Sequence, residues 1–268
     1  MPSNTQLCCA VVQMNSSDDW RSNFNNALMY IEEASASGAR LVLFPENFLC
    51  FGQSALAQFA PHVDACIEQF QSLSNKTNMT LICGSIPVEN GEGKYYARSL
   101  VIAPEKDTEY YDKIHLFDVD VDDGVGAYRE SDTYCAGDDP KVVYIEGVGL
   151  GLSICYDLRF PELYQHYAKQ GVQLITVPSA FTYATGSRHW ELLLRARAIE
   201  TQSFVLAANQ CGEHQKSRRT WGNSMIIDPD GNILTSANHE PDIIVANLDL
   251  SFLSEIRKKM PIAQHKRL

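Results

Sequence analysis

The stretch KVVYIEGVGLGLSICYDLRFPELYQHYAKQG, residues 141–171, contains two apolar runs followed by a helical pattern. The apolar runs predict two buried strands that are joined at residues 147–149. Pro161 at the first helical position and Gly171 at the end predict a helix over PELYQHYAKQG. Strand followed by helix is the repeating unit of an α/β fold. Cys155 lies between the two elements, where the buried run ends and polar residues begin.

The alternation of strands and helices extends over the rest of the chain. DDWRSNFNNALMYIEEASASG predicts a helix in which Trp20, Phe24, Leu28 and Ile31 share one face, and residues 54–76 predict a second helix. SRHWELLLRARAIETQ predicts a third. Strands are predicted at LCCAVVQM, RLVLFPE, MTLICGSIPV, YYARSLVIAP, VQLITVPSA, SFVLAANQ, NSMIIDPDGNIL and DIIVANLDL. Together these elements predict an α/β fold in which helices cover the outer faces of the sheets.

The composition predicts a single domain over residues 1–268. Hydrophobic residues make up 45% of the chain and charged residues 21%, which is typical of a soluble globular protein. No Pro/Gly/Ser-rich linker and no sharp change in composition marks a boundary. A chain of this length can bury a sizeable core in one unit.

The chain is acidic, with a formal net charge of −11. An acidic surface repels phosphate backbones, and basic residues gather only near the end, in IRKKM and HKRL, so we expect no nucleic-acid partner. An acidic enzyme that binds an anionic substrate needs a local cation in its pocket. Arginines within the fold are therefore of interest.

The first residues, MPSNTQLCCAVVQM, lack the basic region and the long apolar region of a secretion signal. No apolar run approaches the length of a membrane span, so we expect a cytoplasmic protein without a membrane partner. The eight cysteines are scattered, which favours reduced thiols. Only Cys8 and Cys9 are close together, so no CxxC pair predicts a metal site.

Three reactive residue types follow predicted strands: Glu46 ends LVLFPE, Lys113 follows TEYYD and Cys155 ends LGLSIC. The carboxyl ends of strands in α/β folds converge on one crevice, so we expect these side chains to meet. A thiol with a pKa of about 8.5 needs a base or a nearby positive charge to react. The carboxylate can take the proton. The ammonium and the backbone N–H of Tyr156 can stabilise the negative oxygen of an attacked carbonyl.

Each of the three residues also has a structural explanation. Cys155 can be a packed core thiol, Glu46 can cap a helix and Lys113 can be a solvated charge. A cysteine–histidine pair is the commoner way to activate a thiol, and His115 and His189 are candidates for that role. The pattern alone leaves these alternatives open.

The segments LVLFPENF, YYDKIHLFD and GLSICYDLRFPELY resemble, in order and spacing, the three signature blocks of the nitrilase, or carbon–nitrogen hydrolase, superfamily. TGSRHWELLLRARAIETQSFVLAANQCG and WGNSMIIDPDG extend the resemblance over nearly the whole chain. The resemblance implies a four-layer α-β-β-α sandwich, α/β in class, that pairs through helices into a homodimer or a larger homo-oligomer. The C-terminal tail, about residues 250–268, is then expected in contacts between subunits.

The resemblance implies Cys155 as nucleophile, Glu46 as general base and Lys113 as oxyanion partner. It further implies Glu130, in YRESDTYCAG, as a second glutamate that positions the lysine and the substrate. In the implied mechanism the sulfur attacks a primary amide, Lys113 and the Tyr156 N–H hold the oxyanion, and ammonia leaves. Glu46 then activates the water that hydrolyses the thioester. No metal and no organic cofactor is implied.

Within the superfamily the chain is most similar to amidases of deaminated glutathione and to the ω-amidases of 2-oxo acid amides. This likeness assigns Arg159 and Thr185 to the substrate carboxylate. The structural alternative for Arg159 is an ion pair with Asp157 or Glu162. The segments HWELLLRARAIETQ and AANQCG favour the deaminated-glutathione branch.

Other functions remain open. Within the superfamily these are ω-amidase activity on 2-oxoglutaramate, hydrolysis of N-carbamoyl amino acids and hydrolysis of nitriles. Outside catalysis, a scaffold and a redox-sensing thiol protein are the alternatives. The presence of all four polar positions in one chain favours the enzyme over the scaffold.

Overall fold

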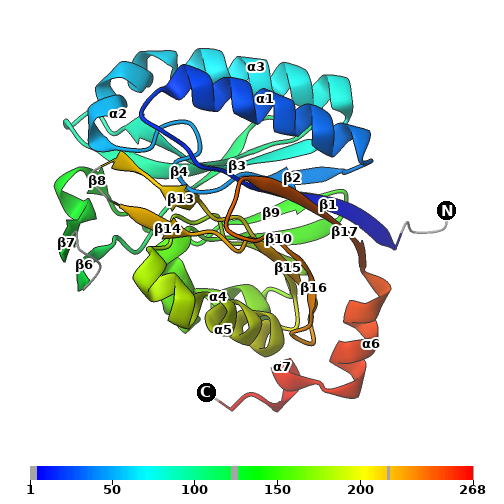
Figure 1. Cartoon of the computed structure of the whole chain (residues 1–268). Coiled ribbons are helices and arrows are strands. Elements are labelled where there is room, and N and C mark those ends of the chain that lie inside the picture. The colour runs from blue at the N-terminus through cyan, green and yellow to red at the C-terminus, as the bar shows by residue number, and fades with distance from the viewer. Residues whose placement is uncertain (1–4, 122–125, 216–217, 268) are drawn as a thin grey trace.

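The computed structural model describes residues 5–121, 126–215 and 218–267. Its two large sheets lie face to face between two layers of helices (Figure 1). The first sheet has the order β17 (Asp242–Asp249), β1 (Gln6–Gln13), β2 (Leu41–Leu43), β3 (Thr80–Glu89), β4 (Tyr95–Ile102) and β5 (Glu109–Asp112), with β8 (Tyr134–Cys135) paired to β4. The second has the order β16 (Ile233–Ser236), β15 (Met225–Ile227), β12 (Phe204–Ala207), β11 (Leu174–Thr176), β10 (Val148–Leu152) and β9 (Val142–Ile145).

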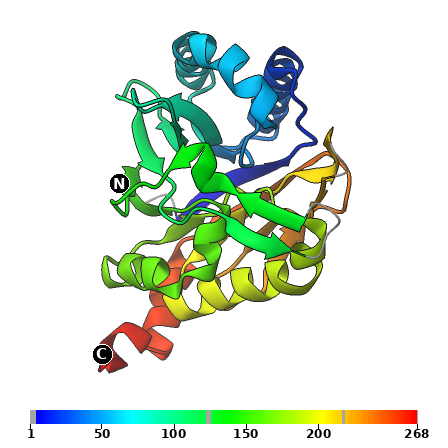
Figure 2. The same ribbon diagram turned by 90° about the vertical axis from the view of Figure 1, so that its left-hand side faces the viewer.

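Helices cover the outer face of each sheet, and two small hairpins flank the sandwich at one end (Figures 1 and 2). The first sheet is covered by α1 (Trp20–Ala36), α2 (Gln53–Phe59) and α3 (Val63–Thr77), and the second by α4 (Pro161–Lys169) and α5 (Tyr183–Thr201). The hairpins are β6 (Asp118–Val121) with β7 (Gly126–Arg129), and β13 (Cys211–Glu213) with β14 (Arg219–Trp221). Near the C-terminus, α6 (Ser251–Lys259) packs on the sandwich through the buried Leu253 and through Arg257, which donates to the Gln202 carbonyl, and α7 (Ile262–His265) follows it. The predicted α/β class and the four-layer α-β-β-α sandwich are confirmed.

The alternation of side chains along β1 explains why this strand is buried on both faces. Leu7, Cys9 and Val11 point into the core between the two sheets, whereas Ala10 and Val12 point into the core beneath α1 and α3. Successive side chains of a strand face opposite sides of a sheet, so a strand covered on both sides must be apolar throughout. The continuous apolar run in the sequence therefore specifies a central strand.

Two differences from the predicted helices have a structural reason, one a break in a helix and the other the choice of buried face. The helix predicted over 54–76 is broken into α2, a 3-10 turn at Ala60–His62 and α3, because Pro61 lacks the N–H that a continuous helix needs. In α1 the buried face is centred on Phe24, Ala27 and Ile31, so Leu28, predicted to face inward, is only partly buried.

The chain direction brings the carboxyl ends of strands from both sheets to one end of the molecule. β1, β2 and β3 run parallel to one another, as do β10, β11 and β12. The connection between β9 and β10 is shorter than predicted and consists of Glu146 and Gly147, both with positive φ, while Gly149 lies within β10. Within the described ranges, no helix has the length and apolar character that crossing a membrane requires.

Candidate active site

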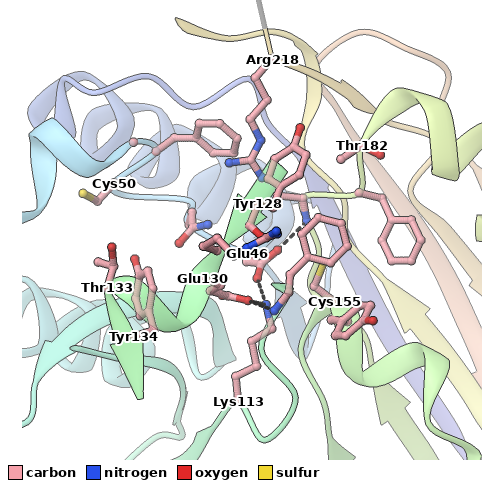
Figure 3. A pocket seen from close by; sticks show the side chains of 18 of the residues that line it. Glu46, Cys50, Lys113, Tyr128, Glu130, Thr133, Tyr134, Cys155, Thr182 and Arg218 are labelled. Atoms are coloured by element: carbon pink, nitrogen blue, oxygen red, sulfur yellow. Dashed lines mark hydrogen bonds and ion pairs between the residues drawn. The ribbon is translucent and has the colours of Figure 1, made fainter. Parts of the chain in front are cut away.

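A cavity of about 470 Å³ lies at this end of the sandwich (Figure 3). Segments from both halves of the chain line it, including the loop after β2, the end of β5, the β6–β7 hairpin and the start of α5. The seven residues to which the resemblance assigned a catalytic or substrate-binding role all line this cavity: Glu46, Lys113, Glu130, Cys155, Tyr156, Arg159 and Thr185.

Glu46 is held by the loop that follows β2, three residues beyond the end of that strand. The loop lies directly against β3 at Gly84, where a Cβ atom would come within 1.9 Å of the Pro45 carbonyl oxygen. Only glycine allows this approach. The next residue, Asn47, has a φ of 57° and donates its N–H to Ser85 Oγ at 3.0 Å. The Glu46 side chain is thereby directed into the cavity and is buried.

Cys155 is the first residue of a short 3-10 helix, Cys155–Arg159, that follows β10. Its φ of 49° is in the left-handed region, and its N–H donates to the Pro178 carbonyl at 2.9 Å. Such a conformation costs a residue other than glycine about 1–3 kcal/mol and is typical of functional sites. The sharp turn presents the thiol to the cavity, although the residue is only 8% exposed.

A buried charge cluster occupies the bottom of the cavity. Lys113 Nζ lies 2.8 Å from Glu46 Oε1 and 2.9 Å from each carboxylate oxygen of Glu130. The other oxygen of Glu46 accepts the backbone N–H of Ala180 at 2.8 Å, and Glu130 also accepts the N–H of Phe117 at 2.6 Å. Both carboxylates are therefore fixed in position before any ligand binds.

The cluster favours an uncharged thiol in the resting protein. Burial raises the pKa of Cys155, and Glu46, which lies within hydrogen-bonding reach of the sulfur, raises it further. Lys113 and the Ala180 N–H lower the pKa, but the two raising effects are larger, so the net pKa is raised. Burial lowers the pKa of Lys113, because it disfavours the charged ammonium. The negative charges of Glu130 and Glu46 have a larger effect in the opposite direction, so the pKa of Lys113 is raised well above its ordinary value. Two carboxylates already surround one ammonium, so a thiolate would add a second net negative charge.

Asp157 connects the segments that carry Lys113 and Cys155, and sequence reasoning missed this role. The carboxylate is fully buried and accepts the Tyr111 hydroxyl at 2.7 Å, the Ile154 N–H at 2.9 Å, the His115 N–H at 3.0 Å and His115 Nδ1 at 2.7 Å. A buried carboxylate is costly unless hydrogen bonds or an opposite charge replace its contacts with water, and these four contacts do so. In sequence, Asp157 was considered only as an ion-pair partner of Arg159.

The two histidines proposed as alternative activators have other contacts. His115 donates to Asp157 and stacks on Phe160, with ring centroids 3.6 Å apart. His189 Nδ1 lies 3.2 Å from Arg159 Nη1, and its pKa is lowered by burial and by the neighbouring arginines, so the neutral ring accepts from the guanidinium. The residue that contacts the thiol is Glu46.

Arg159 does not form either of the ion pairs considered as its structural alternative. Among the described residues no carboxylate lies within ion-pair distance of it: Asp157 binds Ile154 and His115 instead, and Glu162 is exposed and does not line the cavity. Burial lowers the pKa of Arg159, as expected for a desolvated cation without an anion beside it. Thr185 lines the same cavity, and its hydroxyl is 2.9 Å from Thr182 Oγ1.

The structure adds lining residues that the sequence did not suggest, among them Phe51, Tyr128, Cys50 and Arg218. Arg218 lies in a run of polar and basic residues, QKSRR, which reads as a solvated surface, so no sequence signal identified it. Cys50 and Cys155 lie on opposite sides of the cavity in Figure 3. In the part of the chain that the structure describes, no group of three or more His, Cys, Asp and Glu side chains is arranged to hold a metal ion.

Comparison with known proteins agrees with the fold. The family model "Carbon-nitrogen hydrolase" matches residues 8–258. The chain is 40% identical to the deaminated glutathione amidase of Synechocystis over 96% of this chain and 97% of that protein, and 38% identical to the omega-amidase NIT2 of Xenopus tropicalis over 91% and 89%. The crystal structure of the C. elegans NitFhit protein superimposes with a TM-score of 0.91 at 36% identity, over 98% of this chain and 65% of that longer one. The chain belongs to the carbon–nitrogen hydrolase family.

Proposed function

We propose that the protein is an amidase that hydrolyses the amide bond of a 2-oxo acid amide, with deaminated glutathione as the preferred substrate. The observation that carries the proposal is the contact of Glu46 with both Cys155 and Lys113 in one buried cluster at the bottom of the cavity. The names of the similar proteins, deaminated glutathione amidase and omega-amidase, support the substrate class.

In the proposed acylation step, Glu46 takes the proton of Cys155 as the sulfur attacks the amide carbonyl. The raised pKa of the thiol supports proton transfer during the attack, rather than a thiolate present beforehand. Lys113 and the backbone N–H of Tyr156 hold the oxyanion. In the described part of the chain the Tyr156 N–H has no backbone acceptor, which supports its availability to the substrate. One such donor typically contributes a factor of about 10²–10³ in rate.

Collapse of the tetrahedral intermediate breaks the carbon–nitrogen bond, and the leaving nitrogen takes the proton from Glu46. A water molecule, deprotonated by Glu46, then hydrolyses the thioester and regenerates the thiol. The leaving group is ammonia only for primary amides such as 2-oxoglutaramate. In deaminated glutathione the amide nitrogen belongs to cysteinylglycine, so the expectation of ammonia release does not extend to this substrate.

We assign Glu130 to the positioning of Lys113, and Arg159 with Thr185 to the 2-oxo acid carboxylate. Two bonds from Glu130 to the Lys113 ammonium support the first assignment. The second is supported by a guanidinium that is partly buried, hydrogen-bonded to His189 and without a carboxylate at ion-pair distance among the described residues. Such a group binds a carboxylate with two parallel hydrogen bonds.

The test is a substrate panel for the purified protein: deaminated glutathione, 2-oxoglutaramate, an N-carbamoyl amino acid and a nitrile. Release of cysteinylglycine or ammonia is measured for the wild-type protein and for Cys155→Ala. We expect turnover of deaminated glutathione at the highest kcat/KM, and loss of at least about 10⁴-fold in the variant. Equal rates in the two proteins on every substrate would contradict the proposal.

We further propose that the protein is a homodimer or a larger homo-oligomer, with no nucleic-acid or membrane partner. Four exposed apolar side chains support a subunit interface: Leu192 and Ile199 on α5, and Ile233 and Leu234 on β16. Apart from Leu253, the side chains of α6 and α7 are exposed or partly exposed, which supports contacts between subunits at this tail (Figure 1). Light scattering of the wild-type protein and of Leu192→Asp tests this assembly.

A cytoplasmic location completes the proposal. All eight cysteines are unpaired, which supports a reducing compartment. The alternative of a redox-sensing thiol is disfavoured, because burial raises the pKa of Cys155 and raises that of Cys50 to about 12. Thiols that sense oxidants have a lowered pKa.

A further inference from the structure

Four cationic side chains line the cavity, and two of them have anionic partners. Lys113 is held by the two glutamates. Arg129 pairs with Asp120 at 2.8 Å and donates to two backbone carbonyls. Arg159 and Arg218 differ, since within the described ranges neither has a carboxylate at ion-pair distance. The net charge of the chain is −11, so two unpaired guanidinium groups in one cavity need an explanation.

Arg218 is held between aromatic rings at the end of the cavity opposite Lys113. Its guanidinium lies 4.7 Å from the ring centroid of Phe51 and 5.5 Å from that of Tyr128. In Figure 3 the side chain reaches into the cavity from the top, Lys113 reaches in from the bottom, and Glu46 and Cys155 lie between them. Aromatic faces hold a planar guanidinium in place without using its hydrogen-bond donors.

One donor of Arg218 has no partner in the described part of the protein. Its Nε is buried and has no hydrogen-bond acceptor among the described residues. A buried donor without an acceptor costs about 1–3 kcal/mol. A ligand with an anionic, planar acceptor recovers this cost, and a carboxylate matches the donor geometry of a guanidinium. The arrangement is therefore that of a second carboxylate subsite.

We propose that Arg218 binds a carboxylate on the leaving-group side of the scissile amide, so that the cavity selects amides with a carboxylate on each side. This inference rests on the proposed function, in which Arg159 takes the carboxylate of the acyl side. Deaminated glutathione has both groups, the 2-oxo acid carboxylate and the glycine carboxylate of the departing cysteinylglycine. 2-Oxoglutaramate has only the first, and its leaving group is ammonia. Arg218 thus favours the substituted amide over the primary amide.

The experiment compares Arg218→Met with the wild-type protein on three substrates. These are deaminated glutathione, its C-terminal amide, which lacks the glycine carboxylate, and 2-oxoglutaramate. Arg219→Met is the matched control, because Arg219 is exposed, does not line the cavity and contacts the Tyr183 ring instead. Thermal unfolding of each variant shows whether the fold is retained.

For the wild-type protein we expect kcat/KM to fall about 10- to 100-fold when the glycine carboxylate is replaced by the amide, the range of one charge-assisted contact. Arg218→Met is expected to show the same loss on deaminated glutathione, no further loss on the C-terminal amide and an unchanged kcat/KM on 2-oxoglutaramate. Arg219→Met is expected to match the wild type on all three.

Two results overturn the subsite: an equal loss on all three substrates in Arg218→Met, or wild-type activity of that variant on deaminated glutathione. Binding of deaminated glutathione is also measured by calorimetry, for the inactive Cys155→Ala protein and for the double variant that also carries Arg218→Met. This measurement distinguishes failure of the subsite from failure of the proposed function. Binding that depends on Arg218, together with no turnover by the wild-type protein, retains the subsite and rejects the amidase. Turnover that is insensitive to Arg218 retains the amidase and rejects the subsite.

Discussion

The bottom of the cavity and its upper part use charge in different ways. At the bottom, Glu46, Lys113 and Glu130 neutralise and orient one another through hydrogen bonds of 2.8–2.9 Å. Away from this cluster, Arg159 and Arg218, the latter at the top of Figure 3, line the cavity without a carboxylate at ion-pair distance in the described part of the chain. The paired charges are arranged in advance for a reaction that every substrate undergoes. The unpaired guanidinium groups gain an anionic partner only when a ligand that carries a carboxylate binds, so they are suited to substrate selection.

The largest effect is expected when the paired cluster is broken at Lys113. Lys113→Met leaves the buried carboxylate of Glu46 and the partly buried one of Glu130 without their cation, so we expect a loss of about 3–5 kcal/mol in the free energy of unfolding and at least about 10³-fold in kcat. Urea unfolding and steady-state kinetics measure the two losses. Lys141→Met is the control, since Lys141 forms an exposed ion pair with Glu109 and should cost less than about 1 kcal/mol. A stable Lys113→Met protein would show that the cluster does not depend on its cation.

An intermediate effect, on binding alone, is expected at Arg159. Arg159→Met removes no ion pair of the described structure, so the free energy of unfolding should change by less than about 1 kcal/mol. KM for 2-oxo acid amides should rise about 10- to 100-fold, because the substrate carboxylate loses its partner. Arg195→Met, which removes an exposed ion pair with Glu191 on α5, should leave KM unchanged. A loss of stability in Arg159→Met, comparable to that of Lys113→Met, would remove the distinction between the two regions.

The smallest effect is a pH dependence of stability at His214, which stacks on Phe51 beneath Arg218. Burial lowers the pKa of His214 from 6.5 to about 4, so the folded protein keeps the ring neutral where the unfolded chain binds a proton. The stabilisation is present above pH 6.5 and is lost as the pH falls towards 4. Between pH 7 and pH 5.5, the wild-type protein should lose about 1 kcal/mol relative to His214→Gln. Thermal unfolding across this range measures the difference, and parallel curves would contradict it.

The sequence predicted the paired region of the cavity well, because its residues follow predicted strands. β5 directly precedes Lys113 and β10 comes shortly before Cys155. β5 runs in the same direction as β3, because both strands pair antiparallel with β4, so its carboxyl end lies at the same edge of the sheet as those of β1, β2 and β3. Glu46 was predicted at the end of a strand but lies three residues beyond it, in a loop whose path depends on Gly84 in another strand. The position was correct, while the local reason for it required the structure.

The unpaired region and the supporting network were beyond sequence reasoning. Arg218 reads as surface charge, and only its contacts with Phe51 and Tyr128, from distant segments, direct it inward. Asp157 is two residues from both Cys155 and Arg159, so its neighbours in sequence did not indicate that it binds Tyr111 and His115 across the site. Such contacts depend on tertiary packing, which no local pattern encodes.

The uncharged state of Cys155 affects how the protein should respond to small electrophiles. General alkylating reagents react with thiolates, and the raised pKa leaves little thiolate at neutral pH. A reagent that carries an amide carbonyl can instead occupy the position facing Lys113 and induce proton transfer to Glu46. For selective covalent inhibitors of this protein, we therefore expect the rate of reaction with Cys155 to depend more on the amide group of the inhibitor than on the intrinsic reactivity of its electrophile.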